Sequence, residues 1–272
     1  MSEVRFALSV PNFAEPSELV ELGVRAERAG WHGVLLWDHL FGGPGFAVPM
    51  ADPWVVLGAL AVRTERIRLG TAITPLARRR PQKVARESVS VDRLSVGRMV
   101  LGVGLGSPAE EYTAFHESAD PHVRSAKLDE ALEVLTGLWS GEPFDHHGPH
   151  YQVAGAQFLP EPLQRPRIPI WTACATLNDK TLARAARWDG VVLAKILDGA
   201  GIGELSVEEL SRSIRDITRR RGSLEGFDVA VLNGGIPSET TLAGFAEVGA
   251  TWVLVTGWMD QLHELAAAGP VA

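Results

Sequence analysis

Residues 4–37 read VRFALSVPNFAEPSELVELGVRAERAGWHGVLLW, and this stretch contains one complete strand–helix–strand unit. Val4–Val10 and Gly33–Trp37 are short and almost continuously apolar, as parallel strands covered on both faces are. Between them, Pro16 opens a segment with apolar residues at helical spacing, and Gly30 supplies a C-terminal stop. The stretch therefore predicts two parallel strands joined by a helix.

The same alternation continues along the rest of the chain. Further apolar runs of strand length lie at 67–73, 98–103, 168–172, 190–194, 227–232 and 251–256. Helical patterns begin at Asp52-Pro53 and span 81–94, 124–139, 181–188, 207–221, 239–248 and 259–268. Eight strand–helix units in strict alternation predict an α/β fold of the closed (β/α)8 type, a TIM barrel.

A doubly wound open sheet is the competing architecture, and it needs a glycine-rich phosphate turn after the first strand. Pro11-Asn12-Phe13-Ala14 stands at that place, which favours the barrel. We expect residues 1–272 to form a single domain. Its chemistry should lie at the C-terminal ends of the strands, the mouth of the barrel.

The segment between the fourth and fifth predicted strands, from Gly104 to Arg167, is much longer than the other connections. It contains one helix and then a proline- and histidine-rich stretch from Pro143 to Pro169. Insertions of this length in a compact fold usually carry a function. We expect this stretch to lie over the mouth or to extend an oligomer surface.

Composition excludes several classes of partner. The formal net charge is −7 and no basic stripe follows a phosphate backbone, so nucleic acid is not expected to bind. The arginine runs 78–80 and 219–221 are interpreted as helix-end charges that face water. Cys174 is the single cysteine, which fits a reducing compartment, and no window approaches the roughly 18–20 apolar residues that span a bilayer. We expect a cytoplasmic protein that acts on a small molecule without membrane contact.

Asp38 and His39 directly follow the strand Gly33–Trp37, so both side chains are expected at the mouth. A histidine titrates near neutrality and a neighbouring aspartate can orient it, which suits an acid/base pair. The alternative is a loop-capping pair, in which Asp38 binds backbone amides and His39 is merely packed. Position alone does not separate these two interpretations.

Gly102-Val103-Gly104-Leu105-Gly106 closes the fourth strand. It differs from a dinucleotide fingerprint, because Ser107 replaces the final glycine and the motif does not follow the first strand. Such a turn either brings bare Cα atoms close to a planar ring or phosphate, or is simply tight.

Three other sets of residues are weaker candidates. The Asp/His-rich stretch 145–150 has loose spacing and no fixed helical pair, so no metal site is predicted. Glu110 or Glu111 is a candidate general acid, although the helix dipole more commonly explains glutamates at a helix start. Cys174 has no evident histidine partner, so nucleophilic catalysis has no support.

Taken together, these motifs resemble the luciferase-like family of flavin- and deazaflavin (F420)-dependent oxidoreductases, and the F420-dependent branch is favoured. The resemblance covers residues 1 to about 195 in the family's order. It is carried by AERAGWHGV (26–34), WDHL (37–40), TERIRLGT (64–71), LSVGR (94–98), GVGLG (102–106), LDEAL (128–132), LWSGE (138–142), HY (150–151) and IPIW (168–171).

The resemblance implies the same barrel, with the cofactor ring at its mouth against a non-proline cis peptide between Ala72 and Ile73. It also implies that Asp38 and His39 are catalytic and approach a deazaflavin, with His39 as proton donor or acceptor. The cofactor-binding residues that it implies are Asp38, His39, Thr71, Ala72, Ile73, Gly104, Gly106, Ser107, Thr172, Ala173, Cys174, Ala175 and Thr176.

The chain departs from the family pattern at two places. The phosphate-binding turn after the fifth strand is commonly glycine-rich, but here residues 172–176 read TACAT. The hydroxyls of Thr172 and Thr176 are the groups left to substitute for close backbone contacts. In the branch that oxidises sugar phosphates a glutamate follows the glycine turn, and Ser107 at this position disfavours that substrate.

The sequence therefore predicts an F420-dependent oxidoreductase that transfers a hydride between a deazaflavin and a small organic substrate. Two alternatives stay open: a monooxygenase that uses reduced FMN and oxygen, and a barrel that binds a flavin or another ligand without turnover. Family members are often dimers, so a homodimer is expected. Trp54, Val55, Leu57 and Leu60 offer an apolar face for it, or belong to the ordinary core.

Overall fold

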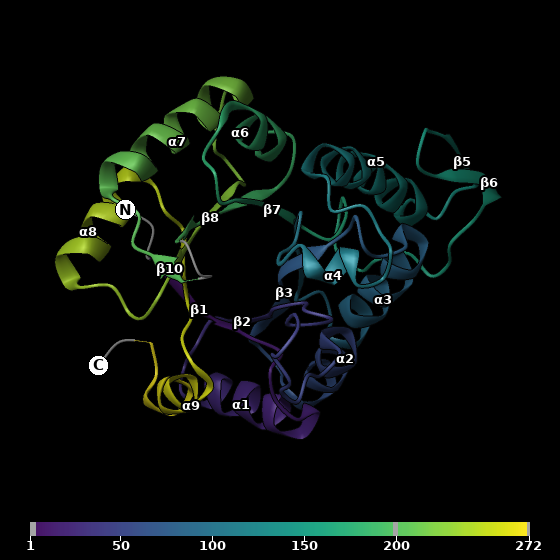
Figure 1. The fold of residues 1–272 in the computed structure, drawn as a ribbon. Coiled ribbons are helices and arrows are strands. Elements are labelled where there is room, and N and C mark those ends of the chain that lie inside the picture. The colour runs from purple at the N-terminus through teal and green to yellow at the C-terminus, as the bar shows by residue number, and fades with distance from the viewer. Residues whose placement is uncertain (1–3, 198–200, 271–272) are drawn as a thin grey trace.

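The apolar runs of the sequence form a closed barrel of eight parallel strands in the computed structural model, which describes residues 4–197 and 201–270 (Figure 1). The barrel strands are β1 (Arg5–Val10), β2 (Gly33–Leu36), β3 (Arg68–Pro75), β4 (Met99–Gly104), β7 (Ile170–Cys174), β8 (Gly190–Leu193), β11 (Asp228–Asn233) and β12 (Trp252–Val255). Around the barrel their order is β1-β12-β11-β8-β7-β4-β3-β2. The predicted (β/α)8 TIM barrel is confirmed, with its insertion between β4 and β7.

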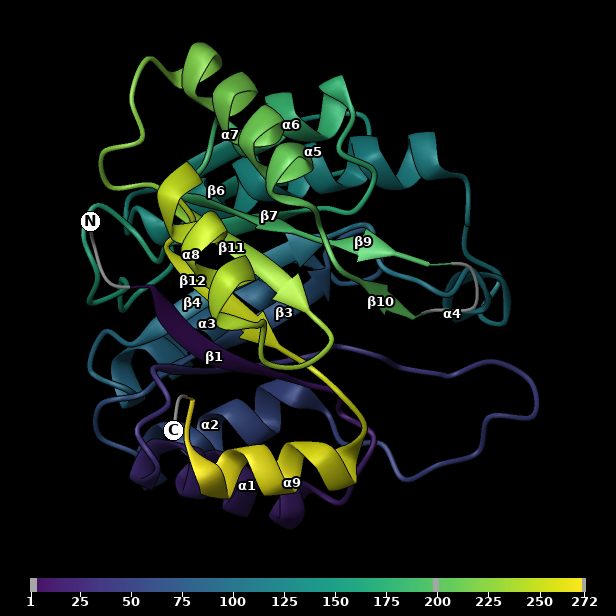
Figure 2. The ribbon, with the colours of Figure 1, turned by 90° about the vertical axis from the view of Figure 1, so that its left-hand side faces the viewer.

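Helices surround the strands as an outer ring (Figure 1). They are α1 (Pro16–Arg28), α2 (Pro53–Arg63), α3 (Pro81–Leu94), α5 (Pro121–Trp139), α6 (Asp179–Ala185), α7 (Val207–Arg221), α8 (Glu239–Val248) and α9 (Met259–Ala268). The short α4 (Glu110–Thr113) lies at the mouth instead (Figure 2). Asp52 caps α2 by accepting from two backbone N–H groups. Asp120 caps α5 by accepting from the His122 backbone N–H, and this helix begins earlier than its apolar spacing predicts. Within the described ranges, no helix is long and apolar enough to cross a membrane.

Alternate residues of the strands face outward to the helices and inward to the barrel axis, and they form two separate apolar clusters. Trp171 and Trp252 fill the N-terminal end of the interior, with ring centroids 5.6 Å apart. At the C-terminal end the inward positions include small residues: Ala72, Gly104, Ala173 and Ala194. Bulky side chains therefore close the bottom of the barrel, and small ones line its mouth.

The insertion between β4 and β7 forms an antiparallel hairpin of β5 (Phe144–His147) and β6 (Gln152–Ala156), which projects beside α5 and α3 (Figure 1). The Arg86 guanidinium lies 3.8 Å from the Phe158 ring centroid, and buried Glu130 accepts from the Tyr151 backbone N–H at 2.7 Å. Of the two places expected for residues 143–169, the mouth is wrong, and an oligomer surface stays a prediction. The apolar face of this stretch packs against the outer helices instead.

Candidate active site

The segments that follow the C-terminal strand ends lie together on one side of the barrel. Figure 2 shows α4, the connection from β2 to α2, and the short ribbon β9 (Lys195–Ile196) with β10 (Ile202–Gly203) on this side. Ile202 packs against the interior cluster of the barrel, as does Ala72 of β3. The mouth is therefore built from segments far apart in the sequence.

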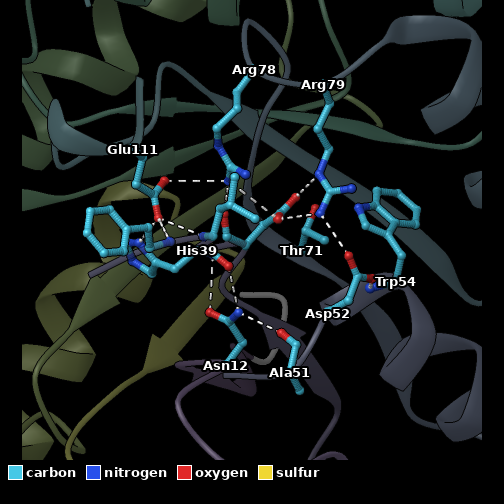
Figure 3. A network of polar contacts seen from close by, with 12 residues as sticks. Asn12, His39, Ala51, Asp52, Trp54, Thr71, Arg78, Arg79 and Glu111 are labelled. Atoms are coloured by element: carbon cyan, nitrogen blue, oxygen red, sulfur yellow. Dashed lines mark hydrogen bonds and ion pairs between the residues drawn. The ribbon is translucent and has the colours of Figure 1, made fainter. Parts of the chain in front are cut away.

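His39 follows β2, and buried Asn12 after β1 holds its backbone (Figure 3). The Asn12 Oδ1 accepts from the His39 N–H at 3.1 Å, while its Nδ2 donates to the carbonyls of His39 at 2.9 Å and Ala51 at 2.7 Å. The imidazole packs beside Phe13 and Trp37, with ring centroids 5.1 and 5.6 Å away. Backbone and ring of His39 are thus both fixed by neighbouring groups.

Glu111 of α4 is the side-chain partner of His39 (Figure 3). Its Oε1 lies 3.1 Å from His39 Nδ1 and accepts from the backbone N–H groups of Leu40 at 2.7 Å and Phe41 at 3.1 Å. Arg78 lies 3.5 Å from Oε2. Burial of Glu111 raises its pKa, but hydrogen bonds from His39, Phe41 and Leu40 and the Arg78 charge together hold the pKa below its usual range.

Asp38 does not contact His39 through its carboxylate, which is fully buried and directed to arginines. Arg79 donates from Nε to Oδ2 at 2.7 Å and from Nη2 to Oδ1 at 2.6 Å, and Arg78 donates to the Asp38 carbonyl. Burial lowers the pKa of Arg79, but the hydrogen bonds and charge of Asp38 raise it above its usual value. The interpretation of Asp38 as the group that orients His39 is wrong, because Glu111 takes that position.

In the arginine run 78–80, which is predicted to face water, two of the three side chains are largely buried. Arg78 and Arg79 have only 6% and 18% of their side chains exposed, because they neutralise Asp38 and Glu111 (Figure 3). Arg80 is exposed at the start of α3, as expected for a helix-end charge. The second run, 219–221, occupies the last turn of α7 as predicted. The sequence pattern of both runs is the same, and only the fold separates them.

The glycine turn is explained largely by close packing of β3 on β4. A Cβ added to Gly102 meets the Thr71 carbonyl oxygen at 1.9 Å, and one added to Gly106 (φ +77°) meets Pro75 at 2.6 Å. Thr71 Oγ1 donates to the Gly102 carbonyl at 2.8 Å and ties the same strands together. Gly104 lies between Ile73 and Ala173, where a Cβ meets side-chain atoms at 3.0–3.2 Å.

The peptide between Ala72 and Ile73 is cis, as the resemblance implies. Both residues are partly exposed at the mouth, whereas Ser107 is exposed at the end of the glycine turn. Ala72, Gly104 and Ala173 carry little or no side chain at these inward positions, so the backbone there is open to close approach by a ligand.

In the turn after β7, some side chains are buried on the outward face of the barrel and others are exposed. Thr172 and Cys174 are buried on the outward face, and Cys174 Sγ donates to the Thr181 carbonyl at 3.2 Å. Burial raises the pKa of the Cys174 thiol to about 11. Ala175 and Thr176 are exposed, and the Thr176 hydroxyl accepts from Asn178 Nδ2 at 2.9 Å. Of the two hydroxyls expected to substitute for glycine, that of Thr172 therefore points away from the mouth.

The histidine-rich stretch 145–150 serves the hairpin. His146 Nε2 lies 3.1 Å from Glu130 Oε1, and His147 Nδ1 lies 3.0 Å from Gln152 Oε1. In the part of the chain that the structure describes, no group of three or more His, Cys, Asp or Glu side chains is placed to hold a metal ion.

The β8, β11 and β12 side of the mouth carries several exposed apolar side chains. Exposed large hydrophobic residues follow these strands: Ile196, Leu197, Ile236 and Trp258. Thr256 continues the inward alternation of β12, and its Oγ1 is buried without a hydrogen-bond partner among the described residues. An unsatisfied buried hydroxyl beside exposed apolar groups is suited to bind a ligand.

Residues 3–232 match the family model of the luciferase-like monooxygenases. The chain belongs to this family. It is 38% identical over 159 residues to an F420-dependent glucose-6-phosphate dehydrogenase of Microbacterium testaceum, covering 57% of this chain and 46% of the relative. It is 30% identical over 166 residues to the oxygenase component of a flavin-dependent trigonelline monooxygenase of Acinetobacter baylyi, covering 61% and 45%.

The chain spans about half the length of the curated relatives it matches, for example 46% and 51% of two of them. Among solved structures, an F420-dependent secondary alcohol dehydrogenase superposes with a TM-score of 0.79 at 16% identity, covering 98% of this chain and 99% of that one. At this identity the likeness shows the barrel fold alone.

The sequence reasoning missed four site residues: Asn12, Phe13, Arg78 and Arg79. Asn12 carried a usable signal, because it is a polar residue directly after an apolar strand. Glu110 and Glu111 are both candidate general acids by their local pattern, but Glu110 is exposed and Glu111 is buried. Burial decides between the two glutamates, and burial is a property of the fold.

Proposed function

We propose that this protein is an F420-dependent oxidoreductase, with residues 1–272 acting as one catalytic domain. The observation that carries the proposal is His39 after β2, whose Nδ1 lies 3.1 Å from Oε1 of the buried Glu111. Family membership and the names of the relatives support the choice of cofactor.

The residues after β2, β3 and β4 fit the ring of a deazaflavin. The turn 172–176 after β7 fits its phosphate less well. Asp38, His39, Thr71, Ala72, Ile73, Gly104, Gly106, Ser107 and the turn 172–176 are the residues proposed to bind or flank it. The turn offers Ala173, Ala175, Thr176 and backbone amides to a phosphate, while Thr172 and Cys174 contribute no side chain to the mouth. When bound, the deazaflavin supplies two-electron hydride chemistry. His39 takes the substrate's proton at Nε2 in the oxidative direction and returns it in the reductive one.

The substrate proposed is small, organic and uncharged, with an apolar part. The arginines nearest His39 are already paired with Asp38 and Glu111, so they do not supply the uncompensated cation that a substrate phosphate requires. The exposed side chains of Ile196, Ile236 and Trp258 offer apolar contact instead.

Titration of the purified protein with F420 and with FMN tests the cofactor. We expect quenching of F420 fluorescence, followed by absorbance changes at the deazaflavin when uncharged alcohols or carbonyl compounds are added. Turnover with sugar phosphates but not with these compounds overturns the substrate class. Protein that purifies with FMN supports the second candidate, an FMN-dependent monooxygenase, which the similarity to the trigonelline enzyme favours. Binding of neither cofactor points to a barrel without turnover.

We further propose a homodimer that works in the cytoplasm. Trp54, Leu57 and Leu60 belong to the core, but Val55 and Val62 are 70% and 63% exposed on one face of α2. Light scattering tests this face, because Val55→Asp should shift a dimer to monomer. A monomeric wild type contradicts the dimer. The single, buried cysteine fits the reducing compartment.

A further inference from the structure

We propose that Glu111 is a positioning residue, which fixes His39 as the Nδ1–H tautomer and leaves the Nε2 lone pair facing the mouth. The tautomer of a histidine is set by the partner of its other nitrogen. Its consequence for catalysis rests on the proposed function, but the tautomer itself does not.

Two backbone N–H groups and the Nδ1 of His39 converge on one oxygen of Glu111. The backbone N–H groups of Leu40 and Phe41 donate to Oε1 at 2.7 and 3.1 Å, and His39 Nδ1 lies 3.1 Å from the same atom. An oxygen that already accepts two backbone hydrogen bonds is an acceptor toward the imidazole as well. His39 Nδ1 must therefore carry the hydrogen.

The charge of Glu111 is balanced away from the imidazole. Only 1% of its side chain is exposed, and Arg78 lies 3.5 Å from Oε2, the oxygen that does not face His39. Arg79 in turn neutralises Asp38, so two carboxylates face two guanidiniums. Glu111 can therefore stay ionised beside His39, and its negative charge stabilises the imidazolium that forms when Nε2 takes a proton.

Neighbouring groups restrict the orientation of the His39 imidazole. Phe13 and Trp37 pack against it, and Asn12 holds the backbone N–H and carbonyl of His39. In the ranges 4–197 and 201–270, no group hydrogen-bonds to Nε2. This nitrogen is thus the one available to a substrate hydroxyl, while Asp38 acts only through the arginines.

The first test reads the tautomer by long-range ¹H–¹⁵N correlation of the histidine rings in the cofactor-free wild-type protein, with His39 assigned from a His39→Gln sample. We expect Nδ1–H. A resonance pattern of Nε2–H overturns the inference. In Glu111→Ala the acceptor is removed, so the Nε2–H population should rise, and an unchanged tautomer also overturns it. Because no cofactor is present, the result is independent of whether the proposed function holds.

The second test separates positioning from folding through kinetics with F420. Glu111→Gln keeps the shape of the side chain and removes its charge, so kcat should fall by about 10–100-fold while KM stays within about twofold. The matched control is Glu110→Gln, the same change at the exposed neighbouring residue, which should leave both constants unchanged. Equal kcat in Glu111→Gln and wild type overturns the role in catalysis even if the tautomer is as expected. Absence of turnover in the wild type refutes the proposed function and leaves the tautomer result standing.

Discussion

The two sides of the barrel mouth are built on different principles. After β1, β2 and β3, buried polar groups satisfy one another: Asn12 holds His39, and Arg79 holds Asp38 (Figure 3). After β8, β11 and β12, the chain presents exposed apolar side chains such as Ile236 and Trp258.

This difference separates two demands on an active site. Proton transfer needs a group fixed to within a fraction of an ångström, and a buried network tied to backbone atoms supplies that precision. Substrate contact needs shape and apolar area, which exposed loop residues provide and which changes without disturbing the network. Damage to the polar side should therefore reduce rate or stability, and damage to the apolar side should reduce affinity.

The largest expected effect is the loss of His39. On the proposed function, His39→Ala should lower kcat of hydride transfer by about 10²–10⁴-fold, because it would remove the positioned acid/base. Stopped-flow absorbance of the deazaflavin measures the rate, and circular dichroism checks that the fold is intact. His122→Ala, at an exposed position in the first turn of α5, is the control and should behave as wild type. An unchanged rate in His39→Ala removes this residue from the chemistry.

Asp38 tests the polar side as a structural unit. Asp38→Ala leaves the Arg79 guanidinium without its bidentate partner, so the free energy of unfolding should fall by about 3–5 kcal/mol. Asp52→Ala, which mainly removes a helix cap at a half-exposed aspartate, should cost about 1 kcal/mol. Urea unfolding at neutral pH measures both. Equal losses of unfolding free energy in the two variants would show that the buried Asp38–Arg79 pair stabilises the fold no more than the Asp52 helix cap does.

The barrel could be predicted from the sequence because its signal is local and repeated. Runs such as Gly33–Trp37 are apolar throughout, and helix starts such as Asp52-Pro53 carry their own capping chemistry. The hairpin 144–156 is harder to place from the sequence, because its few apolar side chains fit a helix surface as well as a mouth.

The partners within the site could not be predicted, because they join residues far apart in the chain. His39 and Glu111 are 72 positions apart, and Asp38 and Arg79 are 41 apart. Sequence proximity favoured Asp38 as the partner of His39, but adjacent residues after a strand project in different directions. The arginines and Glu111 could not be recognised from charge alone, because burial gives them their role.

The apolar side should affect affinity rather than rate. Ile236→Ser removes apolar contact at the mouth and should raise KM for an uncharged substrate by about tenfold, which corresponds to about 1.4 kcal/mol, with kcat little changed. Leu163→Ser is the control, because Leu163 is similarly exposed (44% against 42% for Ile236) but lies on the outer insertion. Steady-state kinetics separates the two constants. A fall in kcat alone would mean that this side also positions the reacting atoms.

The smallest effect concerns the acid stability contributed by Glu111. Its folded-state pKa lies below the ordinary value of 4.5, so its stabilisation is present above that pH and is lost as pH falls through the lowered pKa. Wild type should therefore be more stable than Glu111→Gln at pH 7, and the two unfolding free energies should converge below about pH 4.5. Glu110→Gln, at an exposed position, should instead run parallel to wild type throughout. Urea unfolding series from pH 7 to pH 3.5 compare the three proteins. Parallel curves for wild type and Glu111→Gln would mean that the carboxylate of Glu111 is no better stabilised in the folded protein than in water, which contradicts a lowered pKa.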